Sequence, residues 1–305
     1  PSESFDFLGM LLLSPGLALF LFGVSSIPEK GTVADTRVWI PMLAGAALML
    51  AFVRHSFRPE HPLLDLRLFR HRNLTISVIV MFLFVAAFFG SLLLVPTYFQ
   101  QVRGESTLDA GLLVAPQGIG AMLTMPIAGQ LVDRIGPGKI VLTGLALIAA
   151  GMSVFTQVGV DTGYPLLLGA LFVMGMGMGC TMMPTMTAAL QTLTDNSIAR
   201  GSTLMNIVQQ AAGSIGTAAM SVILTSRVIA PQGAPEGSSG QPDAEMLAQL
   251  PPEMQQSVLS SLAEAFAFTF LIATIIMIFA LIPAAFLPRK RAEKTEGAAA
   301  PVVMH

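Results

Sequence analysis

The residues Leu74-Thr-Ile-Ser-Val-Ile-Val-Met-Phe-Leu-Phe-Val-Ala-Ala-Phe-Phe-Gly-Ser-Leu-Leu-Leu-Val-Pro-Thr-Tyr98 form an apolar stretch without a single charged side chain. A helix needs roughly 20 mostly apolar residues to cross the hydrocarbon core of a bilayer, and this stretch is long enough. Of the 305 residues in the chain, 53% are hydrophobic and only 11% are charged, and the mean hydropathy is +0.72. This composition leaves too little polar surface for a soluble domain of this size, so it predicts a membrane protein.

Seven further apolar stretches lie on either side of the first one. They are Phe7–Ile27, Val38–Val53, Ala110–Val132, Ile140–Val158, Pro165–Leu190, Ser202–Thr225 and Ala265–Leu287. The second stretch of the chain, Val38–Val53, is the shortest, and its helix could extend to Phe57. The sequence therefore predicts an all-α polytopic membrane protein with eight transmembrane helices.

The basic residues of the loops indicate how the helices are oriented, because Lys and Arg accumulate on the cytoplasmic side. With the N-terminus inside, twelve of the sixteen basic residues fall in cytoplasmic loops, and only Lys30, Arg37, Arg103 and Arg227 fall outside. This asymmetry predicts a multi-pass membrane protein with both ends in the cytoplasm. The twelve inner residues are Arg54, Arg58, Arg67, Arg70, Arg72, Arg134, Lys139, Arg200, Arg289, Lys290, Arg291 and Lys294.

The lengths of the loops predict how the chain is organised. Residues 1–57 hold two helices, residues 58–73 form a cytoplasmic linker, and residues 74–288 form a six-helix bundle. The bundle includes a polar outer loop over residues 227–263, and residues 289–305 form a cytoplasmic tail. The chain opens at Pro1 without an initiator Met or a signal peptide, so we expect it to be a fragment of a longer protein.

One loop carries a motif: Gly129-Gln-Leu-Val-Asp133-Arg134-Ile-Gly136-Pro-Gly-Lys139. A small residue permits close packing, an acid and a base meet at a helix end, and the glycines and proline favour a tight turn. The stretch resembles the G-x-L-x-D-R-x-G-x-x-K signature of major facilitator transporters. We assign Gly129, Asp133, Arg134, Gly136 and Lys139 to a conformational latch; the alternative is that the Asp–Arg pair only caps a helix.

Other segments resemble the fourteen-helix drug:proton antiporter-2 (EmrB/QacA) branch of that superfamily. They are FLGMLLLSPG from Phe7, PLLDLRLF from Pro62, and PTYFQQ from Pro96 followed by AGLL from Ala110. The last one runs from Asn206 to Thr217 and ends in AGSIGT. The resemblance implies that the first two helices are an extra central pair and that the last six are the C-terminal bundle. It also implies that an N-terminal six-helix bundle of the same chain is missing here. Members of the branch often have an Arg where this chain has Gln209, so no role in coupling is carried over to that position.

The resemblance implies a secondary active exporter of amphipathic or cationic drugs in the bacterial plasma (inner) membrane, driven by proton antiport with alternating access. Its expected partners are the lipid bilayer, small amphipathic substrates, protons and the missing bundle. Two alternatives stay open. One is an exporter of the same fold dedicated to an endogenous lipid, siderophore or metabolite, and the other is a non-transporting membrane scaffold or sensor.

Uncharged polar side chains within the helices are candidates for lining a cavity, because they are costly against lipid. Hydrogen bonding between helices explains them equally well, and for the methionine, packing is the alternative. Close helix packing is the role expected for four small residues, Gly175, Gly179, Gly213 and Gly216. The cavity candidates are Gln117, Asn206, Gln209, Gln210 and Met182.

Several classes of function are not supported by the sequence. None of the 18 acidic residues lies securely within a membrane core; Asp109 and Glu264 come nearest, at outer helix ends, where acids stabilise helix starts. The main proton carrier is therefore expected in the missing half. The spacing of His55, His61 and His71 matches no metal motif, and no enzyme motif is present. We expect no cofactor, no metal and, with a net charge of −2, no nucleic acid partner.

Overall fold

The computed structural model describes residues 7–26, 35–56, 66–191, 193, 195–228 and 251–288. These residues form helices, with no strand among them, and seven of the helices are long and apolar enough to cross a membrane. The eighth helix, α1, has a shorter apolar part, which runs over Leu8–Val24. The prediction of an all-α membrane protein with eight apolar helices is confirmed. The elements are α1 (Phe7–Ser25), α3 (Thr36–Ser56), the short 3₁₀ helix η1 (Leu66–Arg70), α4 (Arg72–Gln101), α5 (Thr107–Ile135), α6 (Pro137–Phe155), α7 (Tyr164–Leu190), α8 (Asp195–Arg227) and α10 (Pro252–Ala284).

Helix α3 is longer than the apolar run Val38–Val53 and ends at Ser56, close to the extension to Phe57 that the sequence allows. Helix α3 has 21 residues and α1 has 19, whereas hydropathy made the second helix the shorter one. The side chain of Asp35 accepts a hydrogen bond of 2.8 Å from the backbone N–H of Arg37, so the helix begins before its apolar run. At the other end α3 continues through Arg54 and His55. Polar residues at a helix end lower the hydropathy without ending the helix.

Two other helices extend into segments that hydropathy assigned to loops. Helix α8 begins at Asp195, before the predicted Ser202, and α10 begins at Pro252, within the expected outer loop. At 1.5 Å per residue, the 33 residues of α10 are about 50 Å long, more than the roughly 30 Å of a bilayer core. Most of the rest of that loop (229–250), part of the linker (58–65) and the expected tail (289–305) lie outside the described residues.

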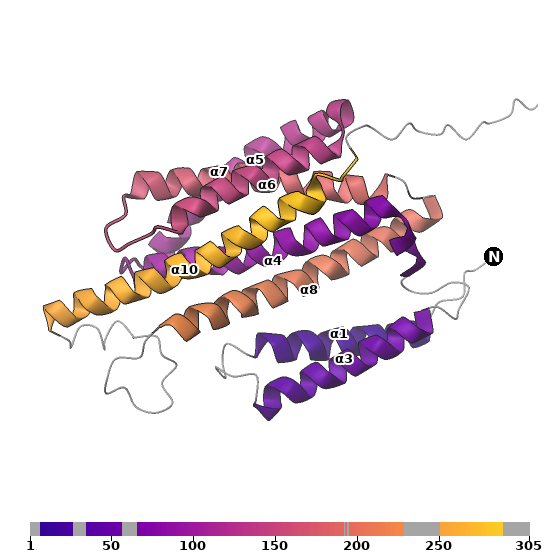
Figure 1. Cartoon of the computed structure of the whole chain (residues 1–305), viewed down its shortest axis with the longest axis horizontal. Helices are drawn as coiled ribbons and strands as arrows, with labels where there is room; N and C mark the ends of the chain where they lie inside the picture. The colour runs from indigo at the N-terminus through magenta and orange to yellow at the C-terminus, as the bar shows by residue number, and fades with distance from the viewer. Residues whose placement is uncertain are drawn as a thin grey trace, which may run out of the picture.

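The helices divide into a pair and a group of six. Helices α1 and α3 lie antiparallel against each other, and the pair lies beside α8, which α1 contacts (Figure 1). In the larger group, α4 packs against α8 and α10, α6 packs against α7 and α10, and α5 packs mainly against α7. This is the predicted arrangement of a six-helix bundle preceded by two helices.

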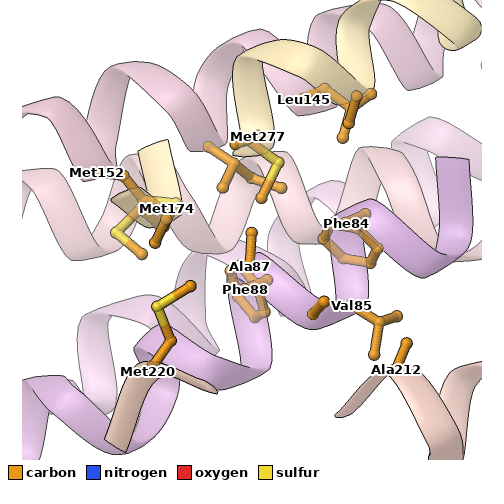
Figure 2. Packing of buried hydrophobic residues seen from close by; sticks show 14 of the residues in the cluster. Phe84, Val85, Ala87, Phe88, Leu145, Met152, Met174, Ala212, Met220 and Met277 are labelled. Carbon is orange, nitrogen blue, oxygen red and sulfur yellow. The ribbon is translucent and has the colours of Figure 1, made fainter. Parts of the chain in front are cut away.

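The core of the six-helix group is built from aromatic rings and methionines. Phe84 and Phe88 of α4 have ring centroids 5.5 Å apart, and both side chains are buried. Figure 2 shows them near buried methionines of the surrounding helices: Met152 of α6, Met174 of α7 and Met277 of α10. Flexible thioethers fill the irregular space beside rigid rings, so the methionines here serve packing.

Several buried hydroxyl groups within the helices donate hydrogen bonds to the backbone of their own helix, whereas the buried hydroxyl of Ser77 in α4 has no partner among the described residues. Thr181 and Thr185 of α7 each donate a 2.7 Å hydrogen bond to the carbonyl four residues earlier, and Thr269 and Thr274 of α10 do the same. In an apolar surrounding an unpaired hydroxyl is costly, and this local bond removes that cost.

Candidate functional site

A cavity lies between α4 and α8, with a volume of about 390 Å³. Helix α8 contributes most of its lining, and α4 contributes Val85 and Phe89, which are one helical turn apart. The α8 side is lined by Gln209, Gln210, Gly213, Ser214, Thr217 and Ala218. We refer to this space as the α4–α8 cavity.

The spacing along α8 explains why its polar groups meet in one place. Gln209, Gly213 and Thr217 are four residues apart, so they follow one face of the helix, and Gln210 and Ser214 lie next to that face. The amide and hydroxyl groups can donate and accept hydrogen bonds, while the ring of Phe89 and the side chain of Val85 offer apolar contact. The arrangement can therefore hold a molecule that has both polar and apolar parts.

The structure brings together only some of the residues predicted to line a cavity. Gln209 and Gln210 are in the lining of the α4–α8 cavity, together with Gly213, which sequence reasoning assigned to helix packing. Asn206 is exposed one turn earlier on α8, outside that lining. Met182 of α7 is half-buried and packs against the hydrophobic core.

Gln117 has a different environment. It is buried in α5, with 5% of its surface exposed, and its side-chain oxygen has no hydrogen-bond partner among the described residues. Its backbone faces α7 so closely that a Cβ added at Gly175 would overlap the Gln117 carbonyl group. The structure therefore places Gln117 in a helix contact and not in the α4–α8 cavity.

Three of the four glycines assigned to helix packing lie at close approaches. Gly175 and Gly179 of α7 face α5, where a Cβ at Gly179 would overlap the hydroxyl oxygen of Thr124. Gly216 of α8 faces the backbone of Ala86 in α4 in the same way. At Gly213 the nearest atom to an added Cβ would be Val85 Cγ1 at 3.7 Å, which is ordinary contact.

The residues of the latch motif surround the turn between α5 and α6. Gly136 ends α5 with a φ of 83°, a left-handed conformation that favours glycine, and Pro137 begins α6. Asp133, Arg134 and Lys139 are exposed, and none of these three side chains is paired with another described residue. Gly129 is exposed too, and a Cβ added there would meet no described atom within 4 Å. The close packing expected at Gly129 is not formed by the described residues.

The turn contacts the end of the last helix instead. The backbone N–H of Gly138 donates a 3.0 Å hydrogen bond to the carbonyl of Pro288, just after α10. A Cβ at Gly138 would lie 2.8 Å from the carbonyl oxygens of both Leu287 and Pro288. The motif therefore joins α5, α6 and the end of α10, a contact that the sequence pattern does not reveal.

Val85 and Phe89 are site residues that sequence reasoning missed. Both belong to the long apolar stretch that defines α4, where no polar residue marks the cavity-facing side. Their position becomes visible only because α4 packs against α8.

The described helices and the α4–α8 cavity define a polytopic helical membrane protein with a mixed polar and apolar cavity between two of its helices. The chain belongs to the Major Facilitator Superfamily, because residues 4–217 match the sequence model of that family.

Proteins with related sequences carry names that concern drug resistance. A "Multidrug resistance protein B homolog" of Mycobacterium tuberculosis (strain H37Rv) is 50% identical over 305 residues, which cover 95% of this chain and 56% of that protein. The "Drug efflux pump JefA" of the same organism is 31% identical, covering 72% of this chain and 43% of the pump. The chain thus spans about half the length of the curated relatives it matches.

A solved structure confirms the fold. The fucose:proton symporter FucP of E. coli matches with a TM-score of 0.57 at 22% identity, over 74% of this chain and 53% of that one. At this identity the similarity bears on the fold alone. The matched relatives are named as transporters and resistance proteins, not as enzymes.

Proposed function

We propose that this chain is the C-terminal part of a secondary active exporter that moves amphipathic or cationic drugs out of the cell by proton antiport. The observation that carries the proposal is the mixed lining of the α4–α8 cavity in a chain that is 50% identical to a named multidrug resistance protein homolog. Amide groups beside an aromatic ring suit substrates that share amphipathic character and differ in detail.

Two features support a partnership with an N-terminal bundle. Helix α5 is largely exposed, since only 22% of the residues in its most apolar stretch are buried, although it belongs to the six-helix group. Its outward positions include Gly111, Gly118 and Gly129, where an added Cβ would meet no described atom within 4 Å. Small residues let membrane helices approach closely, so this face suits a second bundle. Alternating access then follows from rocking of one bundle against the other.

The acidic residues bear on where protons are carried. Asp109 lies at the start of α5 and Asp133 near its end, whereas Glu264, expected at a helix end, is an exposed residue twelve positions after the first residue of α10 and directly before the apolar run from Ala265. Proton coupling needs an ionisable group that both sides of the membrane can reach in turn. We therefore place the main proton carrier in the N-terminal half.

The orientation follows from the loops. The turn between α5 and α6, the start of α8 and the end of α10 lie at one end of the bundle (Figure 1), and Arg134, Lys139 and Arg200 lie there. By the positive-inside rule we assign this end to the cytoplasm of a bacterial cell.

Efflux of a fluorescent cationic dye from cells that express the full-length parent protein tests the proposal. We expect efflux above the vector control, and we expect a protonophore to abolish it, because the proton gradient drives transport. Absence of efflux from a protein shown to be inserted would contradict drug export. It would favour a dedicated endogenous substrate or a non-transporting role.

A further inference from the structure

A second pocket lies at the opposite end of the bundle from the latch motif. At this end one connection joins α4 to α5 and another joins α6 to α7. The connection between α4 and α5 is held there by Arg103. Its guanidinium donates hydrogen bonds to the carbonyls of Val160 (2.5 Å) and Thr162 (2.9 Å) and lies 4.5 Å from the centre of the Tyr164 ring. Both connections lie at the same end in Figure 1. Arg103 therefore fixes the two connections against each other.

The positive charge of Arg103 is stabilised by the groups around it. Burial alone would lower the pKa of Arg103, but hydrogen bonding and charge interactions with Tyr164 and Tyr98 raise it above its ordinary value. The guanidinium therefore stays charged at any physiological pH, and its contacts are with carbonyl groups and aromatic rings.

Two carboxylates beside this arrangement lack a cation. Glu105 accepts a hydrogen bond from the hydroxyl of Tyr164, and Asp109 accepts one of 2.6 Å from the hydroxyl of Ser106. Neither forms an ion pair with a described residue. Neutral hydroxyl donors hold both carboxylates in place without cancelling their charge.

The two carboxylates border a pocket of about 430 Å³ with an apolar wall. Leu112 and Leu113 of α5 and Leu168 of α7 form that wall, and the Tyr164 ring adds an aromatic surface. The side chain of Leu112 is 62% exposed, so the pocket opens to the surroundings of the helices. We call this space the outer pocket, because the proposed orientation places it at the end of the bundle that faces away from the cytoplasm. Its volume lies in the range of small-molecule sites, roughly 300–1,000 Å³.

From this geometry we infer that the outer pocket binds amphipathic organic cations, as a site that exported substrates occupy on the outer side of the membrane. Two unpaired carboxylates attract positive charge, and a wall of leucines with an aromatic ring accepts an apolar body. No group of three metal-ligating side chains occurs among the described residues, so the pocket suits an organic cation better than a metal ion. The inference rests on the proposed export of such compounds.

Asp109 also has a structural role, which the test must separate from binding. The hydroxyl of Ser106, the residue before α5, accepts a 3.1 Å hydrogen bond from the backbone N–H of Asp109 and so caps the helix. Asp109→Asn keeps that backbone donor and an acceptor for the Ser106 hydroxyl. Glu105→Gln likewise keeps an acceptor for Tyr164. The two substitutions therefore remove charge while leaving these hydrogen bonds possible.

The experiment uses a thiol placed in the wall of the outer pocket. Leu168→Cys is introduced into the full-length parent protein after its other cysteines, Cys180 included, are replaced. Labelling of the new thiol by N-ethylmaleimide is measured at increasing concentrations of tetraphenylphosphonium. The neutral compound triphenylphosphine oxide serves as a second probe of similar shape. Leu113→Cys provides an independent reporter in case the first substitution itself disturbs the wall.

We expect tetraphenylphosphonium to protect the thiol. Combining Glu105→Gln with Asp109→Asn should raise the half-protecting concentration about fivefold, the scale expected for two partly exposed charges. Protection by the neutral probe should not change. Glu264→Gln, which removes an exposed acid of α10 outside the pocket, is the matched control and should leave protection by both probes unchanged.

Three results would decide between the proposals. The outer pocket is overturned if tetraphenylphosphonium protects neither reporter thiol. It is also overturned if the double variant reduces protection by the cationic probe and by the neutral probe equally. Normal dye efflux with either of these results would leave the export proposal standing. Carboxylate-dependent protection in a protein that shows no efflux would support the pocket and overturn export.

Discussion

Three glutamines of the bundle have similar hydropathy but different surroundings. Gln209 and Gln210 border the α4–α8 cavity, whereas Gln117 is buried where α5 meets α7. An amide in a cavity can exchange water for substrate, while a buried amide oxygen without a partner costs stability. The same residue type therefore has opposite consequences at the two places.

This contrast predicts different results for the same substitution. Gln209→Ala should weaken transport of hydrogen-bonding substrates about five- to tenfold and leave apolar cations unaffected, because one hydrogen bond contributes about 1 kcal/mol. Gln117→Ala should change thermal stability and leave the order of substrate preferences unchanged. Efflux constants for a panel of substrates and melting of the purified full-length protein measure both.

Asn206→Ala is the comparison for the first variant, because Asn206 is on the same helix outside the cavity lining. A changed substrate order for Gln117→Ala with normal melting would show that Gln117 contacts substrate in the complete protein.

At the scale of elements, the contact between α5 and α7 depends on the absence of side chains. Gly175 faces the backbone of Gln117, and Thr124 of α5 donates a 3.0 Å hydrogen bond to the carbonyl of Met176. A glycine that permits close approach is followed by an interhelical hydrogen bond, so both helices are held at short distance along this stretch.

A valine at position 175 should therefore force the two helices apart. We expect Gly175→Val to lower the stability of the full-length protein by about 1–3 kcal/mol, as for other overpacked interiors. The loss is measured as a lower melting temperature in detergent by size-exclusion chromatography.

Gly169→Val is a matched control on the same helix, because a Cβ at Gly169 meets nothing within 4 Å. Equal losses for the two variants would show that helix propensity, and not the contact with α5, causes the effect.

At the scale of the whole molecule, the turn of the latch motif contacts the end of α10, and its charged side chains have no partner among the described residues. The turn contacts Pro288 through Gly138, while the side chains of Asp133 and Arg134 are exposed. These charged groups are thus available to a surface outside the described residues, which supports the proposed latch in the complete protein.

Asp133→Asn should reduce turnover of the full-length transporter about tenfold or more and leave insertion and substrate affinity near normal. A latch stabilises one of two conformations of the protein. When it is lost, the free-energy difference between the two conformations changes by the energy of the lost interaction, and their populations change accordingly. Dye efflux by cells with matched protein levels measures turnover, and dye binding to purified protein measures affinity. Unimpaired efflux would leave Asp133 with the helix-capping role only.

Much of the fold could be predicted from the sequence because each transmembrane helix is encoded locally. The apolar stretch from Leu74 to Tyr98 lies within α4, and the glycine–proline turn at Gly136 separates α5 from α6. The ends of the helices were harder to predict from the sequence, since α10 begins at Pro252 among polar residues that hydropathy assigns to a loop. Capping and helix propensity decide such ends, and apolarity does not.

The candidate sites were harder to predict for a different reason. Polar residues such as Gln209 are conspicuous on an apolar helix, but Phe89 and Leu168 resemble their apolar neighbours. Their roles depend on which helices pack together, and a single sequence without its partners contains no direct signal for that. The outer pocket likewise forms only because Tyr164 and Glu105, far apart in the chain, meet at one end of the bundle.

The hydrogen bond between Gly138 and Pro288 also has a consequence for biosynthesis. These residues are 150 positions apart (288 − 138), and at about 5–20 residues per second a ribosome needs about 8–30 s to make the intervening chain. The turn between α5 and α6 therefore leaves the ribosome long before its partner exists. Until residue 288 has been made, the nascent protein inserts its helices without the hydrogen bond that joins the α5–α6 turn to the end of α10.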